Sequence, residues 1–273
     1  MHNLEEAEKA NLEFWDEIAS VHFKSYKEVQ KLRKGGIALD EIQIKEVGDV
    51  ENKKFLHLQC HIGTDTLSWA RKGANVTGVD FSKKSIDYAK ILKRELGLKA
   101  RFLVSNVYDL KNKLTERFDI VYTSQGVLCW LNDLVNWAKI INHFLKPGGI
   151  FYIMETHPIL YIFDDLKKGK LDIIHSYFHK TKPIVWDDDY PDYSDSTYIS
   201  KNPTYEWTWS VSDIINSLLE TGLEILFFNE YDKIFYKPLP DMRKDKEGWW
   251  YLPDYLTKLP LIFTLKAKKK PDL

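Results

Sequence analysis

Residues 55–80, with the sequence FLHLQCHIGTDTLSWARKGANVTGVD, decide the fold. The apolar run at 55–58 predicts a strand, and Gly63 lies in the turn that follows it. A helix comes next, and residues 76–79 predict a second strand with Asp80 at its carboxyl end. This order of strand, glycine-containing turn, helix, strand and acidic residue is typical of the first half of a nucleotide-cofactor site.

The alternation of strands and helices continues along the chain. Further strands are predicted at 100–104, 118–123, 150–154, 223–228 and 261–267. Helices are predicted at 5–32, 65–72, 83–96, 132–144 and 212–220, with a short one within 37–52, and Ser82 is the expected N-cap of the helix after it. We interpret Lys146–Gly149 as a turn. Such alternation implies right-handed crossovers and a mostly parallel sheet.

The regular pattern stops at Glu155 and returns only with the helix at 212–220. Residues 157–206 contain many aromatic side chains and the acidic patch 187–192, so we interpret them as an insertion. The whole chain of 273 residues is long enough for one large domain, or for one domain that carries an insertion.

Composition restricts the possible functions. Hydrophobic residues make up 44% and charged residues 29%, which is ordinary for a globular protein, and the net charge of -1 argues against nucleic-acid binding by bulk electrostatics. The two cysteines, Cys60 and Cys129, are too few for a disulfide framework. The first residues lack the apolar run of a signal peptide, and no apolar stretch approaches the length of a membrane span. We therefore expect a cytoplasmic protein without a membrane partner.

Residues 53–155 resemble the class I methyltransferases that use S-adenosylmethionine, and the final helix and two strands resemble them more loosely. In that family the first strand leads into a D-x-G-x-G-x-G-like loop. Here the loop reads HLQCHIG at 57–63, so Gly63 is kept and His57 replaces the acid, and some family members carry a similar Q-C-H sequence. The turn Leu145–Gly149 also matches the family and is structural.

The resemblance implies a doubly wound, mostly parallel seven-stranded sheet whose last strand is antiparallel. It also implies four parts of the chain: an N-terminal helical arm at 1–50, a cofactor-binding half at 51–156, an inserted lid at 157–206 and the rest of the same sheet domain at 207–273.

The family pattern assigns cofactor contacts to particular residues. Asp80 follows Gly63 by 17 residues, near the spacing of a ribose-binding acid, and Phe81 is expected against the adenine. Asn106 is expected at the adenine amino group. The simpler interpretations are a packing turn, a turn aspartate and a loop asparagine. The predicted S-adenosylmethionine-binding residues are Trp15, Gln59, Cys60, His61, Gly63, Asp65, Thr66, Asp80, Phe81, Ser82, Asn106, Val107, Ser124, Gln125 and Gly126.

Methyl transfer is an in-line displacement that needs a base only if the acceptor arrives protonated. The predicted catalytic residues are His157, which directly follows the fifth strand and could instead be a polar cap, and His22 and Tyr26 on the arm. Aromatic side chains of the insertion and its end predict substrate contacts, although a local hydrophobic cluster explains them equally well. They are Tyr161, Trp186, Tyr205, Trp207 and Trp209. The spacing of His57, Cys60 and His61 is not a zinc pattern, so no metal is expected.

The favoured hypothesis is an S-adenosylmethionine-dependent methyltransferase that acts on a small molecule. One alternative is a cofactor-binding or regulatory protein of the same fold without catalysis. Another is a nicotinamide-dependent oxidoreductase, but the chain lacks the G-x-G-x-x-G fingerprint. Nucleic-acid methylation is disfavoured by the charge. The sequence fixes neither the acceptor atom nor the oligomeric state, and a homo-oligomer stays open.

Overall fold

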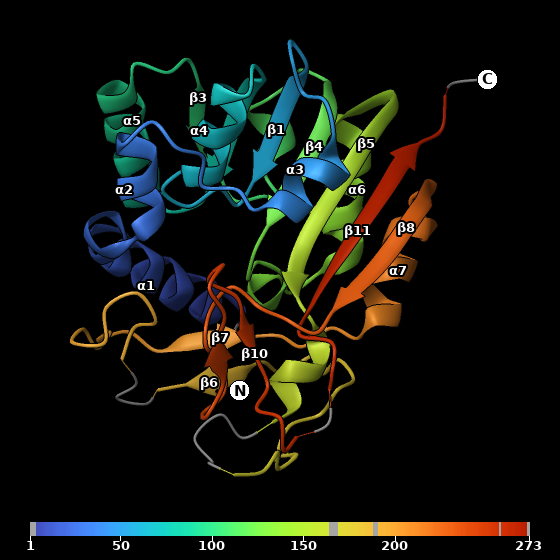
Figure 1. Cartoon of the computed structure of the whole chain (residues 1–273). Helices are drawn as coiled ribbons and strands as arrows, with labels where there is room; N and C mark the ends of the chain where they lie inside the picture. Colours follow the sequence, from blue (N-terminus) through green and yellow to red (C-terminus); the bar gives the residue numbers. More distant parts are fainter. Residues whose placement is uncertain (1–3, 164–168, 188–190, 257, 272–273) are drawn as a thin grey trace.

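The computed structural model describes residues 4–163, 169–187, 191–256 and 258–271. At its centre is a seven-stranded sheet in the order β3-β2-β1-β4-β5-β11-β8 (Figure 1). The strands are β1 (Lys54–Leu58), β2 (Asn75–Asp80), β3 (Arg101–Val104), β4 (Phe118–Ser124), β5 (Leu145–Thr156), β8 (Leu223–Tyr231) and β11 (Ile262–Lys269). β11 is antiparallel to both neighbours, β5 and β8, while the pairs among β1 to β5 are parallel. This confirms the predicted fold class.

Helices cover both faces of the sheet. They are α1 (Leu4–Ser25), α2 (Lys27–Arg33), α3 (Glu41–Val47), α4 (Thr64–Arg71), α5 (Lys83–Leu96), α6 (Leu134–Phe144) and α7 (Val211–Glu220). Neighbouring residues of a strand point to opposite faces, so Leu56 belongs to the core beneath α6 and α7 while Phe55 packs with Trp69 of α4 on the other side. Burial on both faces explains why the central strands read as continuous apolar runs.

Two boundaries differ from the sequence prediction. The expected helix at 5–32 is two helices, because Tyr26 is extended (φ -61°, ψ 122°) and the chain turns there before α2. The turn buries Val29 and Leu32 beside α4 and α5. β5 begins at Leu145, so the expected turn at 146–149 is an irregular start of the strand, where Gly148 has a positive φ of 77° and the register with β4 shifts. The predicted N-cap Ser82 is confirmed, since its side chain accepts the Ser85 N–H.

Two excursions extend from the edge at which the parallel strands end (Figure 1). The first is the expected insertion, with the short strands β6 (Ile184–Trp186) and β7 (Thr204–Glu206). Of its acidic patch, residues 188–190 lie outside the described ranges. The second runs from 232 to 261, between β8 and β11, and contains β9 (Arg243–Lys244) and β10 (Trp250–Tyr251). The sequence pattern did not separate this second excursion from the sheet domain.

Across the residues that the structure describes, every helix is too short or too polar to cross a membrane.

Candidate functional site

A large cavity of about 1170 Å³ lies at the carboxyl edge of the sheet. The loops after β1, β2, β3 and β4 form one side, and α1, α2, the start of α3 and the 232–261 excursion form the rest. Twelve of the fifteen predicted cofactor residues line it; the exceptions are Gly63, Thr66 and Ser82. The structure therefore brings together residues that are up to 111 positions apart in the sequence, from Trp15 to Gly126.

The turn after β1 adopts a glycine-like backbone with two non-glycine residues. Gln59 and His61 have φ of 56° and 47°, in the left-handed region that costs a non-glycine residue about 1–2 kcal/mol. Their side chains hold the turn in place. The Gln59 amide donates to the carbonyl of Val127 (3.2 Å), and the His61 Nδ1 lies 2.9 Å from the Ser85 hydroxyl. These contacts offset the backbone cost and explain how the unusual loop keeps its shape.

Gly63 has a different role from the expected approach to the cofactor. Its φ is 76°, and a Cβ at this position would lie 2.8 Å from the ring of Phe102 on β3. Its N–H donates to the carbonyl of Cys60, and Gly63 caps α4. The glycine is therefore needed for close packing of the turn against the sheet.

Asp80 is fixed at the end of β2. Its Oδ2 accepts the His61 N–H (2.8 Å) and its Oδ1 accepts the Ser82 N–H (2.9 Å). Burial raises the pKa of this carboxyl group to about 6, although both hydrogen bonds favour the ionised form. Each carboxylate oxygen keeps a further lone pair, so Asp80 can accept a hydroxyl of a ligand in the cavity.

The loop after β4 is shaped by a buried carboxylate that the sequence did not reveal. Glu155 accepts the backbone N–H groups of Gly126 (2.6 Å), Val127 (2.7 Å) and Leu128 (3.2 Å), as well as that of Thr156 (2.7 Å). Gly126 and Val127 line the cavity, so Glu155 positions one of its walls without reaching it.

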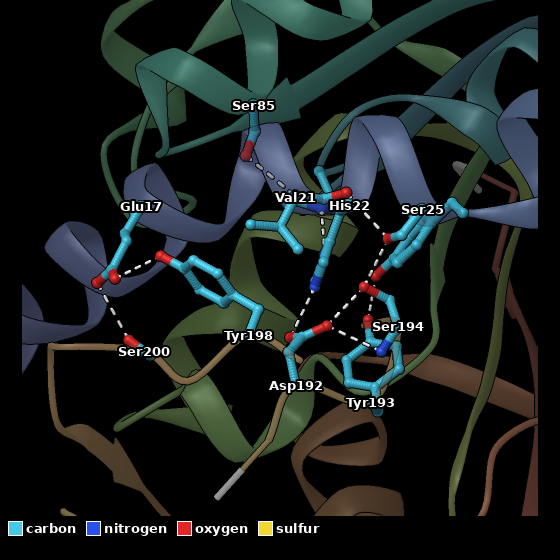
Figure 2. Close-up of polar contacts among 12 residues, drawn as sticks. Glu17, Val21, His22, Ser25, Ser85, Asp192, Tyr193, Ser194, Tyr198 and Ser200 are labelled. Carbon is cyan, nitrogen blue, oxygen red and sulfur yellow. Dashed lines mark hydrogen bonds and ion pairs between the residues drawn. The ribbon is translucent and has the colours of Figure 1, made fainter. Parts of the chain in front are cut away.

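A chain of hydrogen bonds ties the arm, the turn and the insertion together (Figure 2). His22 of α1 lies with its Nε2 3.0 Å from Asp192 and its Nδ1 2.9 Å from the Nε2 of His61, which in turn reaches Ser85. Burial lowers the pKa of His61 well below its usual range, and the charge of His22 adds to the effect. Although burial alone raises the pKa of Asp192, hydrogen bonds from His22 and Ser194 bring it below its ordinary value. This arrangement joins a neutral His61 to an ionised Asp192 through His22.

The same arm binds the insertion at a second point. Glu17 accepts hydrogen bonds from the hydroxyl of Tyr198 (2.5 Å), the hydroxyl of Ser200 (3.1 Å) and the amide of Asn202 (2.6 Å). The insertion is therefore fastened along α1.

Of the three residues predicted to be catalytic, one lines the cavity and two lie outside its lining. Tyr26 lines the cavity, but burial raises its pKa well above the usual range and its hydroxyl contacts that of Tyr193, so it is a poor base at neutral pH. His22 is buried behind the turn and does not line the cavity. His157 also lies outside the lining: its Nδ1 accepts the Ile159 N–H, and its Nε2 is 2.9 Å from Glu230. His157 thus caps the short helix at Pro158–Ile162, which was the simpler interpretation.

None of the five predicted substrate-binding aromatics lines the cavity. Tyr205 and Trp207 are buried beside Ala7 of α1, which is the local cluster weighed as the alternative. Trp209 donates its Nε1–H to the carbonyl of Leu131 and stacks on His179. Trp186 contacts the ring of His175, and Tyr161 is half-buried near Cys129. These contacts pack the insertion internally and against α1 and the loop after β4, and a substrate contact by these residues stays a prediction.

The far wall of the cavity consists of residues that the sequence analysis missed. From the 232–261 excursion come Lys233, Phe235, Tyr236, Lys237, Lys244, Trp249 and Trp250. From the start of α3 come Asp40 and Gln43. Basic and aromatic residues lie close together in the sequence at 233–250, and this mixture is the feature from which a ligand-binding segment could have been predicted.

A polar network connects this far wall to the turn. The Gln43 amide donates to the hydroxyls of Tyr122 (2.5 Å) and Ser124 (2.9 Å), and the Tyr122 hydroxyl donates to Asp65 (2.9 Å). Burial raises the pKa of Asp65 to about 7, so this carboxyl group in the cavity lining changes its charge near neutral pH.

Comparison with known proteins agrees with this geometry. The sequence profile of the methyltransferase domain family matches residues 56–153. The ubiquinone biosynthesis O-methyltransferase of Pseudomonas syringae is 27% identical over 170 residues, which cover 60% of this chain and 69% of that protein. The enzyme of the same name from Actinobacillus pleuropneumoniae is 30% identical over 161 residues, covering 58% of this chain and 65% of that protein.

The fold has solved counterparts. The crystal structure of an S-adenosylmethionine-dependent methyltransferase from Mesorhizobium loti superimposes with a TM-score of 0.56 at 19% identity, over 81% of this chain and 93% of that one. The chain spans between 47% and 69% of the length of the curated relatives described as ubiquinone biosynthesis O-methyltransferases. The sheet order is that of the class I methyltransferase fold, and the part of the chain that matches the methyltransferase domain family contains the loops after β1 to β4 that line the cavity.

The residues present fit S-adenosylmethionine as the cofactor. The Oε1 of Gln59 is buried at the cavity and has no hydrogen-bond partner among the described residues, which is costly unless a ligand supplies a donor. The ammonium group of the methionine moiety is such a donor. Asp80 stands where the ribose is expected, and Asn106 lines the cavity beyond it. Gln59 and Asp80 therefore offer acceptor oxygens that suit the ammonium and ribose hydroxyl groups of the cofactor.

Proposed function

We propose that this protein transfers a methyl group from S-adenosylmethionine to a small-molecule acceptor bound between the turn after β1 and the 232–261 excursion. The observation that carries the proposal is the single cavity that joins Asp80 and Gln59 at one end to Trp249 and Trp250 at the other. Its volume of about 1170 Å³ exceeds the roughly 300–1,000 Å³ of a typical small-molecule site, so it has room for a cofactor and an acceptor together.

The bound cofactor supplies an activated methyl group on a sulfonium. The protein orients and encloses it: Asp80 accepts the ribose hydroxyls, Asn106 faces the adenine and Gln59 holds the methionine end. Glu155 fixes the backbone of the loop after β4, which lines the cavity and would help to enclose the cofactor. The cofactor would donate its methyl group to the acceptor atom and leave as the neutral thioether, while the residues named here would only orient and enclose it.

An acceptor that arrives protonated must also lose a proton. We propose Asp65 for this step instead of His157, since Asp65 lines the cavity and its pKa of about 7 suits a general base. Tyr26 and His22 then serve to close the arm over the cofactor. Replacing Asp65 with asparagine should abolish the rise in turnover around pH 7 while leaving cofactor affinity within about threefold. Unchanged dependence of turnover on pH would rule out this role.

Calorimetry tests the proposal directly. S-adenosylhomocysteine, the demethylated product, should bind in the micromolar range, and Asp80→Asn should weaken it at least tenfold because asparagine offers only one oxygen. Lys258→Gln, an exposed change outside the cavity lining, serves as the control. Absence of binding contradicts the proposal, and binding without methylation of any acceptor would favour the regulatory alternative.

The cellular setting is part of the proposal. We propose a cytoplasmic enzyme without a nucleic-acid partner, and light scattering should decide between a monomer and a homo-oligomer. The O-methyltransferases named above support an oxygen acceptor, which isotope-labelled methyl transfer would test.

A further inference from the structure

The 232–261 excursion gives the acceptor end of the cavity an unusual chemistry. Three lysines, Lys233, Lys237 and Lys244, line the cavity from this one segment, together with a single carboxylate, Glu247. In the part of the chain that the structure describes, none of the three lysines forms an ion pair. This segment therefore gives its side of the cavity an excess of positive charge.

The lysines are arranged over aromatic rings. The Nζ of Lys233 lies 4.4 Å from the ring centroid of Trp249, and the Nζ atoms of Lys244 and Lys237 lie 5.3 and 5.7 Å from that of Trp250. These distances are within the range of cation–π attraction. The ammonium groups are thus held at the faces of the two indoles, which restricts where they can meet a ligand.

Further rings extend the same wall. Phe235 and Tyr236 pack against each other with centroids 5.0 Å apart, and both line the cavity with Trp249 and Trp250. All four are half-buried, so part of each ring is covered and part is accessible. A flat ligand can lie along such a surface, while a purely aliphatic one gains less from it.

Carboxyl groups also line the rest of the cavity; they are Glu8, Glu28, Asp40, Glu41, Asp65 and Asp80. Asp40 caps α3 by accepting the Gln43 N–H. Burial raises the pKa of Asp40, and the positive charge of Lys233 nearby lowers it by a smaller amount. Asp65 is committed to the Tyr122 hydroxyl and is partly neutral near pH 7. Glu28 pairs with its neighbour Lys27 at the arm. Three of these carboxyl groups are therefore neutral in part or already engaged, and the 232–261 segment itself contributes three lysines against one carboxylate, Glu247.

We propose that the acceptor is a flat, aromatic molecule that carries an anionic group, a carboxylate or a phosphate, held by Lys233, Lys237 and Lys244 while its ring lies on Trp249 and Trp250. This inference rests on the proposed function, because it describes the second ligand of the same cavity. It assigns substrate selection to the excursion between β8 and β11. The insertion at 157–206 instead holds the N-terminal arm in place through its hydrogen bonds to His22 and Glu17 of α1.

The test uses three simple probes and the full-length chain. Benzoate, phenyl phosphate and the neutral benzamide are titrated into the protein by calorimetry, with and without saturating S-adenosylhomocysteine. Wild-type protein should bind at least one anionic probe ten or more times more tightly than benzamide. Preference for phenyl phosphate over benzoate assigns the anion as a phosphate, and the reverse assigns a carboxylate.

Variants connect the preference to the wall. The triple variant K233Q/K237Q/K244Q should reduce the preference to less than about threefold and keep S-adenosylhomocysteine affinity. A matched control removes three exposed lysines that do not line the cavity, Lys90, Lys139 and Lys258, and should keep the full preference.

Each outcome decides a different question. Equal binding of all probes, no binding up to millimolar concentration, or full preference in the triple variant overturns the inference. Failure of S-adenosylhomocysteine to bind contradicts the proposed function instead, and the titrations without it still measure the anion preference.

Discussion

Replacing Asp65 with asparagine should stabilise the folded protein at neutral and alkaline pH. Asp65 lies half-buried in the first turn of α4, and desolvation raises its pKa from 3.8 to about 7. Between these two values the unfolded chain has lost the proton that the folded chain still holds. The free energy of unfolding therefore falls as pH rises through this window. Asparagine cannot ionise, so the variant lacks this loss.

The size of the effect follows from the shift. A change of about three units corresponds to about 4 kcal/mol at 1.36 kcal/mol per unit, which is the upper bound above pH 7. Asparagine keeps a carbonyl oxygen that can accept the Tyr122 hydroxyl, so the network through Gln43 is preserved. We expect the variant to match wild type within about 1 kcal/mol at pH 5 and to exceed it by about 2–4 kcal/mol at pH 8.

Urea unfolding at pH 5, 6, 7 and 8 measures this difference. Asp119→Asn is the control, because hydrogen bonds from Lys146 and the Lys54 N–H lower the pKa of Asp119 although partial burial acts in the other direction. That variant should gain no stability at pH 8. A difference between wild type and Asp65→Asn that stays constant from pH 5 to pH 8 would refute the reasoning.

Three further substitutions probe the turn and the loop after β4. His61→Gly relieves the left-handed strain but removes the hydrogen bonds to His22 and Ser85, and should lower stability by about 1–3 kcal/mol in urea unfolding; a more stable variant contradicts this. Gly63→Ala should cost about 2–4 kcal/mol more than Gly97→Ala, since both have positive φ but only Gly63 lacks space for a Cβ; equal unfolding midpoints would argue otherwise. Glu155→Gln replaces one acceptor oxygen with an NH2 donor that faces backbone N–H donors, and should cost about 2–4 kcal/mol. Faster amide exchange at 126–128 is the check, and unchanged exchange would contradict the prediction.

The sheet and most of the cofactor end could be predicted from the sequence for a physical reason. Strand and helix periodicity is a local property, and parallel strands bring their carboxyl ends to one edge, so Asp80 and Asn106 had to meet there. Gly63 packs against Phe102, and Glu155 accepts backbone N–H groups of the loop after β4. These partners are distant in the sequence, so no local sequence pattern could predict the contacts.

The acceptor end could not be predicted in the same way. Tyr205, Trp207 and Trp209 were predicted to contact substrate, but α1 packs against the first two and the carbonyl of Leu131 accepts the indole N–H of the third. Lys233 and Trp249 are in irregular chain with short strands, where periodicity carries no information. Their meeting depends on how the segment between β8 and β11 folds back, which is a tertiary property.

The place of β11 in the sheet has a consequence for biosynthesis. β11 pairs with β5 along seven residues and with β8 along eight, yet it follows both of them in the chain. Until residues 262–269 leave the ribosome, β5 and β8 each expose an unpaired edge, and such edges invite association with other nascent chains. The sheet therefore closes late, and a stalled or shortened translation product should need chaperones far more than the finished polypeptide does.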